Sequence, residues 1–348
     1  MKKALFFLGV ALALAACSKT VTVVDEAPNA ITINAVSSVP TRGAELVGAK
    51  FPEALPIVVG ASTAEQPNFL ADPGQKFAWN GTTDSGIWWA VDASDAHKAV
   101  FWPIGGKTVD FLAYAVNPAD ADIPTPTFDS EKAAKKFTVS GWDTYNKQAD
   151  FLYAVAHNQK NQKTGVPMVF NHTQALIIFN VRYISGDATD FAISEVKFEE
   201  KFTTGTLEVN NEYTKPIVTW TTSGTAADLV MPSGTDGDVA SEIKSPVAAN
   251  ETSEIVNYGT PLTKGATFKQ LGETLLVIPQ TASNPIVTYT LGGKTYEYEV
   301  NAIRLNWEAG KAYIYDLSFS NNEILLAPSV VDWTVVDASD GTEVTPAP

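Results

Sequence analysis

The most apolar stretch of the chain outside its N-terminus is residues 166–184, and it alternates as a β-strand does. Every second side chain on one face is apolar, namely Ala175, Ile177, Phe179, Val181 and Tyr183. Leu176 and Ile178 make the opposite face apolar as well, so we expect this strand to be covered on both sides. Residues 166–170 resemble a shorter strand. We therefore predict that this pair of core strands opens a second domain.

The rest of the chain contains short alternating segments that Gly, Pro and Asn separate, with almost no helical periodicity. This pattern predicts an all-β protein of the sandwich or barrel class. The length of 348 residues suits two domains. We place them at residues 30–165 and 166–320, followed by C-terminal strands in residues 321–348.

The tetrapeptide GGKT occurs twice, beginning at Gly105 and at Gly292. A phosphate-binding loop needs another glycine five residues earlier and a helix afterwards. Phe101 and Thr288 occupy those earlier positions, and both copies lie between expected strands. Both copies are therefore predicted to be hairpin turns.

The N-terminal 17 residues have the pattern of a lipoprotein signal peptide. Lys2 and Lys3 precede a short apolar run, too short to span a bilayer, that ends in the sequence LAAC. Cys17 is the only cysteine, at the position where a lipobox requires one. The alternative is an ordinary secretory signal. We expect lipidation at Cys17, a tether over residues 18–29, and no intramolecular disulfide.

The composition narrows the classes of partner. Apolar residues make up 45% of the chain, so a packed core is expected. The formal net charge of −15 argues against nucleic acid or an anionic membrane surface as a partner.

The sequence contains no pattern that predicts catalysis or cofactor binding. The histidines are His97, His157 and His172, and no two have the spacing of metal ligands. No nucleophile motif of the G-x-S-x-G type is present, although a dispersed catalytic triad leaves no sequence signature. We expect a protein that is not an enzyme and that has no metal site.

The eight tryptophans suggest a second hypothesis for the function, the binding of glycans. Neighbouring residues of a strand face opposite sides, so one of Trp88 and Trp89 would be exposed unless both faces are covered. An exposed aromatic face can stack on sugars, and core filling is the alternative.

Arg42 lies in a turn-rich segment shortly after the first expected strand, residues 30–36. An exposed Arg42–Gly43 bond in such a loop would be a cleavage site for a trypsin-like protease. An inert surface arginine is the alternative.

The order of several short segments resembles the fimbrillin family of Bacteroidales, including its Mfa-like lipoproteins. The similarity covers almost the whole chain except residues 222–272. The matching segments are LAAC at Cys17, TRG at Arg42, FWP at Phe101, VDFLAY at Val109, VFNH at Val169, NWEAGKAYIY at Asn306 and VDW at Val331.

This resemblance implies two tandem transthyretin-like Greek-key β-sandwiches. It also implies a fimbrial subunit on the outer membrane that supports adhesion, first held by its lipid and then cut after Arg42 by an arginine-specific protease. Loss of the first strand would open a groove for an extended segment of another subunit, in a homopolymer or a heteropolymer. Residues 321–348 are the candidate donor, with candidate anchors Ile324, Leu326, Val331 and Val335. An outer-membrane glycan-binding lipoprotein for polysaccharide uptake is the alternative.

Overall fold

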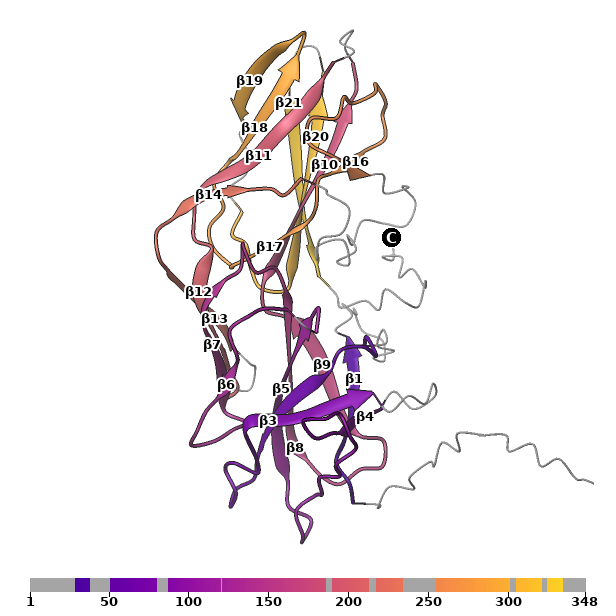
Figure 1. The fold of residues 1–348 in the computed structure, drawn as a ribbon, viewed down its shortest axis with the longest axis vertical. Helices are drawn as coiled ribbons and strands as arrows, with labels where there is room; N and C mark the ends of the chain where they lie inside the picture. Colours follow the sequence, from indigo (N-terminus) through magenta and orange to yellow (C-terminus); the bar gives the residue numbers. More distant parts are fainter. Residues whose placement is uncertain are drawn as a thin grey trace, which may run out of the picture.

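The computed structural model of the protein describes residues 29–37, 51–79, 87–119, 121–185, 190–212, 217–233, 255–300, 305–320 and 324–333. Each regular element within them is a β-strand, which confirms the all-β class. The molecule is elongated, with β8 (Asp150–Gln159) towards one end and β19 (Lys294–Glu299) towards the other (Figure 1).

Seven strands of the N-terminal part close into a barrel in the order β1-β4-β3-β2-β5-β8-β9. Besides β8, these are β1 (Thr32–Ser37), β2 (Ile57–Ser62), β3 (Leu70–Trp79), β4 (Ile87–Ala90), β5 (Val109–Asn117) and β9 (Val166–His172). Their inward side chains form one buried cluster that includes Phe51, Phe77, Trp88, Phe111 and Phe170. The first strand closes this barrel, because it pairs with β4 on one side and β9 on the other.

The C-terminal part packs two sheets face to face. One has the order β15-β16-β10-β20-β21, with β17 also on β10, and the other has the order β14-β11-β18-β19. Their strands are β10 (Ala175–Tyr183), β11 (Ala192–Lys201), β14 (Ala227–Val230), β15 (Ile255–Val256), β16 (Lys269–Leu271), β17 (Leu275–Val277), β18 (Pro285–Leu291), β19, β20 (Lys311–Phe319) and β21 (Ile324–Asp332).

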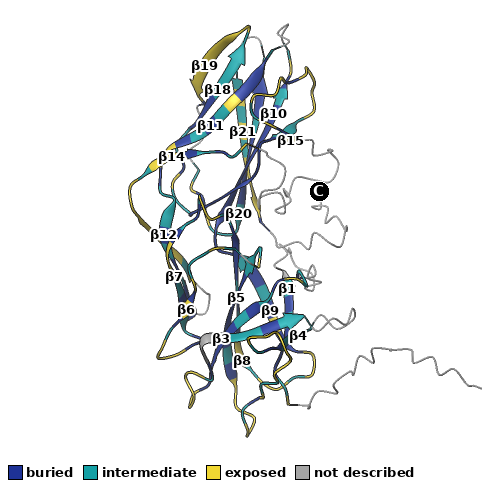
Figure 2. Ribbon diagram, in the orientation of Figure 1, coloured by how far each residue is buried: buried dark blue, intermediate teal, exposed yellow. Residues whose placement is uncertain are grey.

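Strand β10 is the centre of this part, as its apolar alternation predicts. It runs parallel to β20 over eight residue pairs. Ile177 and Phe179 face the core between the two sheets, whereas Leu176 and Ile178 belong to a smaller buried cluster on the opposite face. The expectation that β10 is covered on both sides is confirmed, and it is almost wholly buried (Figure 2).

A fourth sheet, ordered β13-β12-β7-β6, joins the two parts. Its strands are β6 (Thr127–Phe128), β7 (Lys136–Asp143), β12 (Thr204–Asn210) and β13 (Ile217–Ser223). Phe137 and Leu207 pack on Tyr114 and Phe151, which point outward from the barrel strands β5 and β8. Burial raises the pKa of the Tyr114 hydroxyl to about 12.

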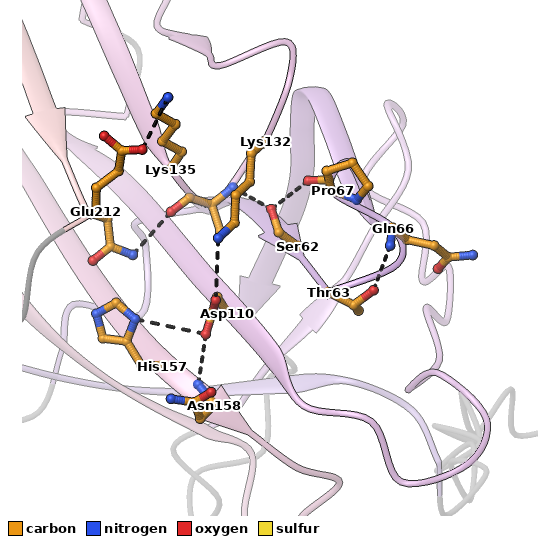
Figure 3. Close-up of polar contacts among 12 residues, drawn as sticks. Ser62, Thr63, Gln66, Pro67, Asp110, Lys132, Lys135, His157, Asn158 and Glu212 are labelled. Carbon is orange, nitrogen blue, oxygen red and sulfur yellow. Dashed lines mark hydrogen bonds and ion pairs between the residues drawn. The ribbon is translucent and has the colours of Figure 1, made fainter.

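Polar contacts reinforce this junction (Figure 3). The Ser62 hydroxyl accepts a hydrogen bond from the Ala134 backbone N–H at 2.9 Å, and the Ala134 carbonyl accepts one from Asn211 Nδ2 at 3.1 Å. Glu212 lies 3.2 Å from Lys135, and this hydrogen bond raises the pKa of the lysine. These bonds connect the end of β2 to the residues that follow β12, through the residues just before β7.

The expected boundary between residues 165 and 166 does not separate the sheets. Strand β9 pairs with β1 and β8 rather than opening a second sheet. In the opposite direction, β12 from the second half pairs with β7 from the first. Apolar alternation identifies a strand and its buried face but not its neighbours, so the sequence did not predict this crossing.

The two GGKT segments differ. Leu291 and Lys294 pair across Gly292 and Gly293, so β18 and β19 form the expected two-residue hairpin. The turn at Gly105 is not a hairpin, because β5 pairs with β2 and β8 instead.

Candidate assembly site

The first strand fills a slot in the barrel wall. Ile33 pairs with Trp88 of β4 and with Val166 of β9, antiparallel to the former strand and parallel to the latter. Ile31, Ile33 and Ala35 alternate along the strand and are buried in the barrel core. Removing β1 would therefore leave two unpaired strand edges beside three empty apolar positions.

Aromatic rings form the floor of this slot. Phe51 contacts Trp88 edge-on with ring centroids 5.6 Å apart and contacts Phe170 at 4.4 Å. The Trp88 indole N–H donates a hydrogen bond to the Leu55 carbonyl at 3.2 Å, which fixes the ring. A rigid apolar floor of this kind favours an incoming strand with aliphatic side chains at alternate positions.

Gly165 lets the loop before β9 approach β1. Its φ of +76° favours glycine, and a Cβ built on it would lie 3.1 Å from the Asn34 backbone nitrogen. Gly105 has a similar φ of +90° but open space around its Cβ position. Both glycines therefore have a left-handed backbone conformation, but only Gly165 lies close to β1.

We expect Gly165→Ala to lower the free energy of unfolding more than Gly105→Ala does. The left-handed backbone alone costs about 1–2 kcal/mol for alanine. Crowding against β1 adds about 1–3 kcal/mol at Gly165. Urea denaturation of both variants measures the difference, and equal losses would show that Gly165 does not hold β1 in place.

The cleavage candidates Arg42 and Gly43 lie outside the described residues, as do Cys17 and Val335. The structure describes β1 up to Ser37, five residues before Arg42. Processing at Arg42 and lipidation at Cys17 therefore stay predictions.

The candidate donor anchors Ile324, Leu326 and Val331 lie in β21, which pairs with β20 over nine residues. Ile324 and Leu326 are half-buried against the sandwich core, whereas Val331 is 38% exposed. Strand β21 is an edge strand, which tolerates Pro328 because alternate N–H groups of an edge point away from the sheet.

A buried aromatic contact holds the end of β21. Trp333 stacks on His172, the last residue of β9, with ring centroids 3.4 Å apart and planes 9° apart. His172 Nδ1 lies 2.8 Å from Asp150 Oδ1, and both side chains are buried. The C-terminal strand is thus tied to β9, which forms one wall of the β1 slot. The sequence did not predict that His172 would lie in β9 or that it would stack on Trp333.

The structure contradicts a glycan platform at Trp88. Its side chain is 0% exposed, because it is part of the barrel core and contacts Trp79 as well as Phe51. Trp89 faces the other way, half-buried beside His97. One half-buried ring gives no extended stacking surface.

Among the described residues, no group of three or more His, Cys, Asp and Glu side chains could hold a metal ion. Within the same residues, no helix is long and apolar enough to cross a membrane.

Comparison with known proteins shows to which family this architecture belongs. Residues 57–333 match the model of the fimbrillin-like family. No curated protein matches the sequence.

Among solved structures, the similarity extends over nearly the whole of three Bacteroides proteins. A protein of Bacteroides uniformis whose proposed role is cell adhesion is 19% identical, covers 87% of this chain and 99% of its own, and has a TM-score of 0.50. A Bacteroides ovatus protein with the same proposed role is 16% identical, with coverage of 88% and 99% and a TM-score of 0.51. A fimbrial protein of Bacteroides vulgatus is 15% identical, with coverage of 88% and 99% and a TM-score of 0.50.

At these identities, the solved structures establish a shared fold. The family match spans most of the chain and every strand except β1. The chain therefore belongs to the fimbrillin-like family.

Proposed function

We propose that the protein is a structural subunit of a cell-surface fimbrium and that it assembles by exchange of its first strand. The observation that carries this proposal is the position of β1. It fills a slot between β4 and β9 with three buried aliphatic side chains, and the chain reaches Arg42 five residues later. Family membership and the cell-adhesion and fimbrial relatives support the same role.

In the intact chain, β1 occupies its slot at a very high effective concentration. A strand from another subunit cannot compete until a cut after Arg42 frees β1 to leave. The incoming strand then gains the main-chain hydrogen bonds of both slot edges. Each buried isoleucine adds about 1.5–3 kcal/mol before the cost of ordering the strand.

The donor we propose is residues 321–348 of a neighbouring subunit, with Ile324, Leu326, Val331 and Val335 as candidate anchors. This role requires β21 to leave β20 and Trp333 to leave His172. We further propose that Cys17 anchors the precursor in the outer membrane and that an arginine-specific surface protease makes the cut. The two halves would then correspond to two transthyretin-like sandwiches, the first modified by closure around β1.

An arginine-specific protease gives a direct test, because the chain has only three arginines. Arg182 lies within β10, where its Nε donates a hydrogen bond to Ser318 Oγ at 2.8 Å, and Arg304→Lys removes the third site. We expect cleavage at Arg42 alone to release the peptide that ends at Arg42 and to give a ladder of polymers on a native gel.

The matched control is Arg42→Lys, which keeps the charge but resists this protease. It should stay monomeric in vitro and reduce the surface polymer in cells. If the cleaved protein keeps the β1 peptide and stays monomeric, strand exchange gated at Arg42 is wrong for this chain.

A further inference from the structure

The end of the molecule at which β1 begins has a local charge opposite to that of the whole chain. The net charge is −15, yet residues 97–109 and 157–166 contain no aspartate or glutamate. They contain four exposed lysines: Lys98, Lys107, Lys160 and Lys163. The two segments are neighbours, because Val109 of β5 pairs with Gln159 of β8. We call these two segments the basic end.

Both segments of the basic end contact Asn29, just before β1. The Trp102 backbone N–H donates a hydrogen bond to the Asn29 carbonyl at 3.0 Å. Asn161 Nδ2 donates one to Asn29 Oδ1 at 2.9 Å. Asn29 lies 12 residues after Cys17. Even a fully extended chain would keep a lipidated Cys17 within about 40 Å of this end.

Two large apolar side chains protrude from the same end. Ile104 is 95% exposed and Phe101 is 51% exposed. Ile104 precedes a turn in which Gly105 and Gly106 have φ values of +90° and +69°. Apart from the adjacent residues of the chain, no atom of the described residues lies within 4 Å of the Cβ position of either glycine. In water, an isoleucine at this position gains no burial, whereas at a bilayer surface it would insert among the acyl chains.

We propose that the basic end rests on the bilayer that holds the lipid anchor, with Ile104 and Phe101 in the interface and the lysines against anionic lipid headgroups. This inference rests on the lipid anchor of the proposed function. The net charge alone argues against such a partner, but screening over about 8–10 Å makes the local charge decide the contact. Carboxylates border the basic end. Glu65 lies 3.3 Å from Lys107, Asp92 interacts electrostatically with Lys98, and Asp110 lies 3.9 Å from His157 (Figure 3).

The contact would orient the precursor for processing. Strand β1 leads away from the basic end, and its six residues span roughly 20 Å. The chain that leads to Arg42 would therefore leave β1 on the side away from the lipid surface. A few lysines and two apolar side chains bind weakly without a lipid, so the contact would be lost when the cut separates the anchor from the subunit.

Site-directed spin labelling of the intact, lipidated precursor tests the proposal. With Cys17 blocked by its lipid, Ile104→Cys provides the one thiol for a nitroxide, and Thr295→Cys on β19 provides the control at the opposite end of the molecule. The probes are vesicles of phosphatidylcholine with one quarter phosphatidylglycerol. We expect the label at position 104 to be more accessible to oxygen than to a water-soluble nickel complex, and the label at position 295 to show the reverse.

A second measurement uses Cys17→Ser, which removes the lipid and leaves only the surface contact. We expect partition of this variant into the same vesicles to fall about fivefold for each of Lys98, Lys107 and Lys163 replaced by glutamine, and to fall with added salt. Equal nickel accessibility at positions 104 and 295, or partition that ignores these lysines, would overturn the membrane contact. A precursor that carries no lipid would overturn it together with the anchor, while the polymer ladder after cleavage at Arg42 reports separately on strand exchange.

Discussion

Replacing Ile33 with alanine is expected to lower the free energy of unfolding by about 2–5 kcal/mol, because the side chain is fully buried in a closed barrel. The consequence is larger after cleavage at Arg42. If the whole loss appears in the dissociation rate, the freed β1 peptide leaves between about 30-fold and several thousand-fold faster. Mass spectrometry of the released peptide over time measures this rate.

The matched control for Ile33→Ala is Asn34→Ala, one residue further along β1. Asn34 faces away from the core and is half-buried, so its loss should cost about 0.5 kcal/mol or less. Ile33→Val is the milder variant if the alanine protein does not fold, with an expected cost of about 0.5–1.5 kcal/mol. Release rates that are the same for the Ile33 and Asn34 variants would mean that the slot does not hold β1 by side-chain burial.

Replacing Trp333 with alanine is expected to lower the free energy of unfolding by about 3–5 kcal/mol, as for other buried tryptophans. The variant loses the stack on His172 and the packing against Leu176, Ile178 and Ile314. Because Trp333 directly follows β21, the amide hydrogens of that strand should exchange faster than those of β10 in the variant. Hydrogen exchange followed by mass spectrometry locates the effect.

Leu325→Ala, within β21, is the control for Trp333→Ala. Its side chain is 53% exposed, so we expect a loss of about 0.5–1 kcal/mol and little change in exchange. Trp333→Phe should keep part of the stack, so its loss in the free energy of unfolding should lie between those of Trp333→Ala and Leu325→Ala. Equal destabilisation by Trp333→Ala and Leu325→Ala would show that the contact with His172 does not hold the C-terminal strand.

Alternation predicted most of the strands because burial of one face leaves a period-two pattern in the sequence. Residues 175–183 alternate, and they form the central strand β10. Pairing was harder to predict, because hydrogen bonds between backbones carry no side-chain signature. Strand β9 pairs with β1 and β12 pairs with β7, yet nothing in the side chains of β9 and β12 indicates these partners.

At the candidate site, too, the strand could be predicted from the sequence, whereas the contacts between distant residues could not. The first expected strand, residues 30–36, corresponds to β1, and the structure buries Ile31, Ile33 and Ala35. The contact of Trp333 with His172 joins residues 161 positions apart. Gly165, which lets its loop approach β1, resembles any turn glycine in the sequence. In both cases, the contacting residues are far apart in the sequence, and only the fold brings them together.

The junction between the two parts has a mechanical consequence for a fibre under tension. Strand β9 of the barrel continues into β10 after only two residues, Thr173 and Gln174, both buried. Beside this covalent path, β7 and β12 are joined by a six-pair ladder, and β10 lies along β20 over eight pairs. A pull along such ladders loads many hydrogen bonds together rather than one after another. A subunit built in this way would transmit force along its length without separating at the junction between its halves. In a fibre joined by strand exchange, the first contact to break under tension would then be the one between the slot and the strand that fills it.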